Sequence, residues 1–179
     1  MPTDTFVRLA LPRDVEAIAA IQAKTWRASY TDVLPDEALE SLPEVAYVQW
    51  EAALAAPPTD AHHVLVAIEF EPRAEEVVGF AAVSPSDDAD ADPRTVGSLI
   101  ALIVDADHRG AGHGARLLAA AVDTMRANRF SMATTWQSEA DTSTIAFLTA
   151  TGWALDGARR EIDTGRATIA ERRLHTALT

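Results

Sequence analysis

The stretch from 99 to 118 constrains the fold more than any other part of this sequence. Its apolar start, Leu99–Val104, is short and rich in β-branched residues, which predicts a buried strand. In Ala115–Met125 apolar residues recur at helical spacing, which predicts an amphipathic helix. The intervening segment 105–114 contains three glycines and no proline. A buried strand, a tight turn and a helix in this order indicate an α/β protein.

The glycines of this turn, Gly110, Gly112 and Gly114, predict an anion site. Glycine allows positive φ and has no Cβ to keep a ligand away from the backbone. The first N–H groups of the following helix lack partners within the helix, and the positive end of the helix dipole lies behind them. A diphosphate suits such a site. The alternative is a tight connection whose glycines only permit close packing.

Two common nucleotide-binding motifs do not match the turn. A Walker loop ends in Gly-Lys-Ser/Thr, but the only lysine of the chain is Lys24, far upstream. A dinucleotide-binding fingerprint has an acidic residue closing its second strand, and the strand expected at Ser131–Gln137 ends without one.

The pattern Arg-x-x-Gly-x-Gly, which begins at Arg109 after an apolar strand, resembles the acyl-coenzyme A loop of the GNAT superfamily of N-acyltransferases. Thr5–Leu9 and the helix Asp14–Ala28 resemble the first strand and helix of that family, and Asp141–Trp153 is similar to a later helix. The resemblance covers nearly the whole chain. It implies a single α/β domain over residues 1–179, with a mixed, largely antiparallel central sheet flanked by helices.

The resemblance also implies acetyl-CoA as co-substrate and no metal. A bulge is expected to splay the central strand from its neighbour and free backbone groups for the pantetheine amides. The implied coenzyme contacts lie at the end of this strand, in the turn and at the start of the later helix: Leu102, Ile103, Val104, Arg109, Gly110, Ala111, Gly112, His113, Gly114, Ala115 and Asp141.

The usual acid–base residues of the family are missing. A glutamate often lies early on the central strand, where this chain has Ser98, and a tyrosine often protonates the leaving thiolate, where this chain has Leu148. The other candidates are Tyr30, Ser98 through a water molecule, Glu139 and His175. Because a phenol is an acid at neutral pH, we select Tyr30 as the candidate catalytic residue.

In the family, the helical arm between the first two strands forms part of the acceptor pocket. Trp26 and Tyr30, at the end of the first expected helix, are therefore candidate acceptor contacts, and the alternative is that both rings fill the core. A second helix is expected over Glu44–Ala55, after a break near Pro35, with Trp50 in the core.

The other elements follow from local patterns. Apolar runs separated by polar turns predict two antiparallel hairpins, and Gly152 is expected to end the helix that starts at Asp141. The hairpins comprise His63–Phe70 with Val77–Val83, joined by Glu71–Glu76, and Trp153–Ile162 with Ala167–Thr176.

Two polar stretches could suggest a metal but lack the necessary partners. The aspartate-rich loop Ser86–Asp92 has neither the glycine nor the closing glutamate of an EF-hand, and the pair His62-His63 has no further ligands nearby. We expect the loop to be solvated, mobile and dispensable for folding.

Charge and composition restrict the partners. A net charge of −12 argues against nucleic acid, and it favours either a cationic acceptor or simply solubility. No apolar run approaches a membrane span, and the absence of cysteine is compatible with the cytoplasm. We expect a cytoplasmic N-acetyltransferase for a small-molecule or peptide amine, with a homodimer left open. The alternative is a catalytically inactive acyl-CoA-binding module.

Overall fold

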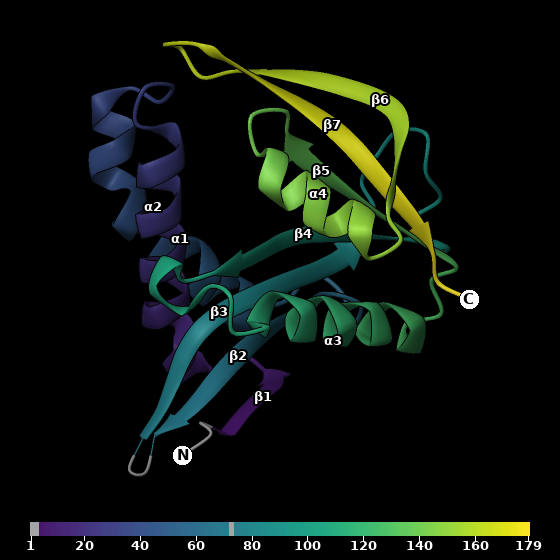
Figure 1. Ribbon diagram of the computed structural model, residues 1–179, viewed down its shortest axis with the longest axis horizontal. Helices are drawn as coiled ribbons and strands as arrows, with labels where there is room; N and C mark the ends of the chain where they lie inside the picture. Colours follow the sequence, from purple (N-terminus) through teal and green to yellow (C-terminus); the bar gives the residue numbers. More distant parts are fainter. Residues whose placement is uncertain (1–3, 72–73) are drawn as a thin grey trace.

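The computed structural model describes residues 4–71 and 74–179, and its strands form one seven-stranded sheet in the order β1-β2-β3-β4-β5-β7-β6 (Figure 1). Neighbouring strands are antiparallel except β4 and β5, which confirms the mixed, largely antiparallel sheet. The strands are β1 (Asp4–Leu9), β2 (His63–Glu71), β3 (Ala74–Pro85), β4 (Val96–Val104), β5 (Met132–Ser138), β6 (Ala154–Asp163) and β7 (Thr168–Ala177). The helices are α1 (Val15–Tyr30), α2 (Asp36–Ala55), α3 (His113–Ala127) and α4 (Thr142–Ala150), with short 3₁₀ turns at Pro12–Asp14 and Ala106–His108.

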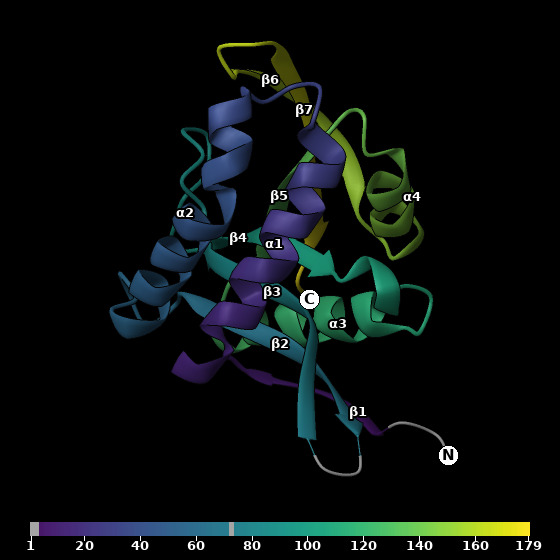
Figure 2. The same cartoon turned by 90° about the vertical axis from the view of Figure 1, so that its left-hand side faces the viewer.

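Helices cover both faces of the sheet, with α3 and α4 on one side and α1 and α2 on the other (Figures 1 and 2). Leu117 of α3, Leu148 of α4 and Leu174 of β7 are wholly buried in the core under α3 and α4. The core under α1 and α2 contains Ile18 and Phe80, and Trp50 packs edge-on against the Phe80 ring at 5.1 Å. Trp50, predicted to lie in the core, is partly buried and packs against it.

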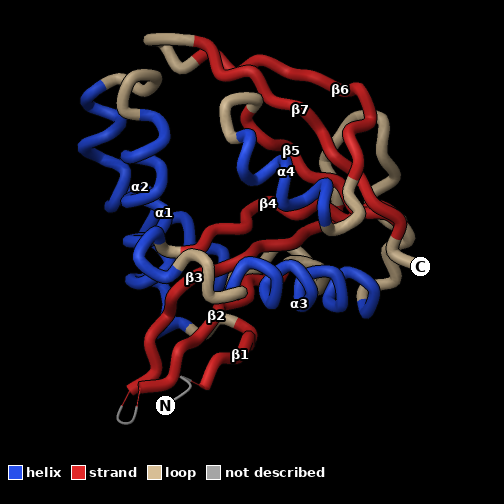
Figure 3. Tube along the Cα trace, viewed as in Figure 1, coloured by secondary structure: helices blue, strands red, loops and turns tan. Residues whose placement is uncertain are grey.

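Both predicted hairpins are present, β2–β3 and β6–β7, and they lie at opposite ends of the molecule (Figure 3). Of the turn predicted to join the first pair, Pro72 and Arg73 lie outside the described residues. The helix at Asp141 also forms as predicted, because the Asp141 side chain accepts a hydrogen bond from the Thr144 N–H and the chain leaves the helix at Gly152 with φ +95°.

The second helix is longer than predicted. It begins at Asp36 rather than Glu44 and continues through Pro43. Proline has no N–H for the carbonyl of the residue four positions earlier, which here belongs to Leu39. The Arg27 side chain of α1 donates to this Leu39 oxygen at 3.0 Å. A contact from the neighbouring helix thus compensates for the missing bond, which a local pattern could not reveal.

Asp14 lies directly before α1, but its side chain does not cap that helix. It accepts hydrogen bonds from the Leu11 N–H at 2.7 Å and from Arg8 of β1 at 2.6 Å. Burial alone would raise the pKa of Asp14, but these bonds hold it below its usual value. Asp14 therefore connects β1 to the segment that leads into α1.

The expectation of a free, solvated loop at Ser86–Asp92 is wrong. Asp88 accepts a hydrogen bond from the Trp136 indole at 2.9 Å, and Asp88 and Asp90 form ion pairs with Arg173 at 3.2 and 2.7 Å. The side chains of Asp88 and Arg173 are each only 11% exposed. The loop is thus fixed to β5 and β7 by residues far along the chain.

Replacing Asp88 by alanine is therefore expected to lower the free energy of unfolding by about 1–3 kcal/mol, the usual cost of leaving buried hydrogen-bonding groups without a partner. Urea denaturation followed by circular dichroism measures this. The matched control is Asp87→Ala, because Asp87 is exposed and has no side-chain partner among the described residues. Equal stability of the two variants would contradict this role of Asp88.

Candidate active site

The turn between β4 and α3 has the backbone conformation that its glycines predict. Gly110 and Gly112 have φ of +82° and +83°, and Gly112 is the N-cap of α3. The first helical hydrogen bond runs from the Arg116 N–H to the Gly112 carbonyl at 3.1 Å. Among the described residues, none accepts a hydrogen bond from the N–H groups of residues 113–115. These donors are available to an anion in front of the helix.

Ionic contacts hold the turn in place from the side of α1. Lys24 of α1 reaches Asp105 at 2.8 Å and Asp107 at 2.7 Å, and the Asp105 carboxylate also accepts from the Asp107 N–H. Burial opposes ionisation of Asp105, but its bonds with Lys24 and with this N–H lower its pKa below the usual value. Arg116 bridges back across the turn to the Ala111 carbonyl at 2.9 Å.

β4 separates from β5 as the resemblance implied. Among the described residues the two strands pair only at Val96–Ser98, and the register between β3 and β4 shifts so that Ile100 has no partner on β3. We call the place where β4 and β5 diverge, after Ser98 and Thr134, the fork. At the fork, the Thr135 hydroxyl donates to the Leu99 carbonyl at 2.8 Å. Beyond it, no strand that the structure describes pairs with the backbone of Leu102–Val104 on the β5 side. The fork therefore exposes strand backbone next to the turn.

The predicted side chains around the turn point in different directions. Arg109 is exposed, with its Nε 3.4 Å from the Val104 carbonyl. His113 is only 2% exposed and contacts Glu69 of β2, so it offers an incoming ligand its N–H rather than its imidazole. The two carboxylate oxygens of Asp141 accept from the N–H and hydroxyl of Thr144. Its contact with coenzyme stays a prediction.

Trp26 and Tyr30 lie outside the buried core. Their rings meet edge to face at 6.0 Å, and Trp26 is 37% exposed. Tyr30 is half-buried, and burial, reinforced by the negative charges of Glu171 and Asp141, raises its pKa. The phenol therefore remains protonated at neutral pH.

The tip of the β6–β7 hairpin closes this region by contacting the turn between α1 and α2 (Figures 1 and 2). The Thr164 hydroxyl donates to the Val33 carbonyl, and Arg166 binds the Leu34 carbonyl at 3.2 Å and Asp36 at 3.0 Å. The hairpin tip and the turn between α1 and α2, about 130 positions apart in sequence, are thus joined on one side of this region.

Two of the other acid–base candidates, Ser98 and His175, lie on strands of the sheet. Ser98 pairs with Thr134, and Thr134 pairs with His175, so the three form one row across β4, β5 and β7. Leu148 is wholly buried.

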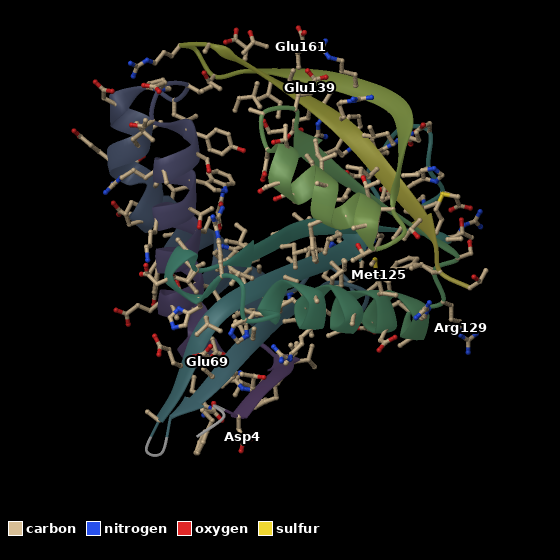
Figure 4. All side chains as sticks on the ribbon, in the orientation of Figure 1. Asp4, Glu69, Met125, Arg129, Glu139 and Glu161 are labelled. Atoms are coloured by element: carbon tan, nitrogen blue, oxygen red, sulfur yellow. The ribbon has the colours of Figure 1, made fainter. Side chains whose placement is uncertain are left out.

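Glu139 lies with Glu161 near the β6–β7 hairpin, and Arg159 bridges the two at 2.8 Å each (Figure 4). Its carboxylate is therefore occupied by an arginine.

A groove of about 230 Å³ begins at Ile100, beside the fork, and continues along α2. Apolar side chains, including Trp50, Leu54 and Ile100, form much of its lining, together with His62 and His63. A larger cavity of about 480 Å³ is lined by Arg8, Arg13, Glu75 and other residues at the β1–α1 corner.

Sequence reasoning missed Glu69, Thr135 and Ile100. Glu69 is a charged residue within the otherwise apolar run from Val64 to Phe70, which was a usable signal. Thr135 and Ile100 depend on strand register, for which the sequence had no local marker.

The next two findings, on metal sites and membrane spans, apply to residues 4–71 and 74–179. Within them no group of three or more histidine, aspartate or glutamate side chains is arranged to hold a metal, and no helix is long and apolar enough to cross a membrane.

The model of the acetyltransferase (GNAT) family matches residues 16–153, so the chain belongs to this family of acetyltransferases. No curated protein matches it in sequence.

Solved structures show the same fold at low identity. The ribosomal-protein-alanine N-acetyltransferase of Brucella melitensis aligns with a TM-score of 0.70 and 22% identity over 96% of this chain and 99% of that chain. A GCN5-related N-acetyltransferase from Kribbella flavida has a TM-score of 0.71 and 19% identity over 97% of each chain. The PaiA N-acetyltransferase of Thermoplasma acidophilum, solved with coenzyme A, has a TM-score of 0.68 and 15% identity over 97% of this chain and 99% of that chain.

Proposed function

We propose that this chain transfers an acetyl group from acetyl-CoA directly to the primary amine of a small molecule or peptide. The observation that carries the proposal is the combination of free N–H groups at the start of α3 with the fork between β4 and β5. Family membership supports the same reaction class.

The residues of the turn suit a diphosphate. The N–H groups of His113, Gly114 and Ala115 would donate to its oxygens, with the exposed Arg109 adding positive charge nearby. A Cβ added at Gly114 would make ordinary van der Waals contact with Val104 and Phe147, at 3.8 and 3.9 Å, so a small side chain would fit there. The backbone of Leu102–Val104 would bind the pantetheine amides.

Acetyl-CoA, when bound, supplies the acetyl group as a thioester. A backbone N–H of β4 near the bulge would donate to the thioester oxygen. A C–N bond forms and the C–S bond breaks, while the amine loses a proton and the sulfur gains one. We assign the donation of a proton to sulfur to Tyr30, whose raised pKa keeps the phenol protonated.

We assign the acceptor to the side of the fork near α1, where Trp26 and Tyr30 would contact it. The apolar groove at Ile100 would accommodate an apolar part of the acceptor. A cytoplasmic location and a homodimer stay predictions.

An inactive acyl-CoA-binding module is the second candidate. It is favoured by the buried Leu148, which has no proton to donate.

Turnover of acetyl-CoA with a panel of amines, followed by the release of free thiol, tests the proposal. We expect thiol release that depends on the amine, together with an acetylated product in mass spectrometry. Calorimetric binding of acetyl-CoA without turnover across the panel would support the module instead. Absence of binding would contradict both.

A further inference from the structure

His113 and Glu69 form a buried polar pair behind the turn. The His113 Nε2 lies 2.6 Å from Glu69 Oε1, and the side chain of His113 is 1% exposed against 19% for Glu69. Figure 4 shows Glu69 on β2 near the start of α3. Because a carboxylate can only accept, the imidazole donates from Nε2. The pair thus connects the first residue of α3 to a strand 44 positions earlier.

Burying this polar pair costs more free energy than burying apolar side chains in the same place would. The Nδ1 of His113 is buried and has no partner among the described residues, and the same holds for Nδ1 of His108, whose Nε2 is 3.9 Å from Glu69. A buried polar atom without a partner costs free energy that an apolar side chain would not incur. What the pair adds is a directional bond, which specifies where the helix begins.

Other anchors of the turn are more exposed. Lys24 is 49% exposed where it meets Asp105 and Asp107, so water and salt weaken its pairs. The bond from His113 to Glu69 is the most shielded of these contacts, and it acts on the residue whose N–H faces the anion site.

We propose that Glu69, acting through His113, positions the N-terminus of α3 for the diphosphate of acetyl-CoA. The inference rests on the proposed function. Glu69 is a positioning residue, because its carboxylate contacts the imidazole and not the ligand. Loss of the bond lets the first turn of α3 shift relative to β4, and small displacements of donors weaken binding strongly.

The test compares two thioesters, acetyl-CoA and S-acetylpantetheine, which lacks the diphosphate. Glu69→Leu is expected to lower kcat/KM for acetyl-CoA about tenfold, equivalent to ~1.4 kcal/mol. The value for S-acetylpantetheine is expected to stay within about twofold of wild type, since no diphosphate bond is lost. Glu69→Gln, whose amide oxygen still accepts from Nε2, is expected to recover most of the loss.

Glu76→Leu is the matched control, because Glu76 faces Glu69 across β2 and β3 but is 54% exposed and does not touch His113. If Glu69→Leu does not fold, His113→Asn, whose side chain is too short to reach Glu69, serves in the same comparison. Equal losses with both thioesters, or none with acetyl-CoA, would overturn the inference. If the wild type binds coenzyme A without turnover, the calorimetric affinity of the same variants decides it. No binding by the wild type would instead refute the proposed function.

Discussion

Replacing Gly112 by valine is expected to lower the affinity for acetyl-CoA at least about tenfold, equivalent to ~1.4 kcal/mol or more. Gly112 has φ +83° and is the N-cap of α3, so a side chain here strains the backbone that orients the free N–H groups. A Cβ at this position would also come within 3.2 Å of the Arg116 guanidinium, which bridges the turn. Isothermal titration calorimetry with acetyl-CoA measures the loss.

Gly157→Val is the matched control for this strain. Gly157 has φ +92° and open space around it, but it lies in β6, away from the turn. Its replacement should cost similar backbone strain and leave coenzyme affinity unchanged. A folded Gly112→Val protein with wild-type affinity would rule out the turn as the diphosphate site.

Replacing Tyr30 by phenylalanine is expected to lower kcat about 10²-fold, the usual contribution of a general acid. The change keeps the ring against Trp26 and removes only the hydroxyl, for which no side-chain hydrogen bond is found among the described residues. The melting temperature should therefore barely change. Stopped assays of thiol release at saturating acetyl-CoA, with thermal unfolding in parallel, separate the two effects.

The pH dependence follows from the direction of the pKa shift. Burial, with Glu171 and Asp141, raises the pKa of Tyr30 above its ordinary value of 10.0, so the phenol holds its proton throughout the neutral range. Deprotonation of Tyr30 should therefore lower activity only at a pH above this ordinary pKa. The Tyr30→Phe variant should lack this alkaline decrease in its pH profile. Trp26→Phe is the neighbouring control. Reduced stability with wild-type turnover in Tyr30→Phe would make the hydroxyl structural.

Local features of the chain were predictable because neighbours in sequence determine them. The turn has positive φ at 110 and 112, which glycine adopts without strain, and the Asp141 cap depends on a residue three positions later. Each involves a handful of consecutive residues. Sequence alone therefore predicted the turn, the later helix and both hairpins.

Contacts between distant residues decided the rest. Pro43 is tolerated within α2 because Arg27 of another helix binds the carbonyl that proline leaves free. The aspartate loop is ordered because Arg173, more than 80 positions later, meets Asp88 and Asp90.

The same division holds at the candidate site. The sequence alone located the turn proposed to bind an anion, because glycine conformation and helix-end N–H groups are properties of the local backbone. Only the tertiary structure placed Glu69 behind His113 and brought Glu171 towards Tyr30. Those partners come from other strands, and strand order and register arise from packing of the whole sheet, which no local pattern encodes.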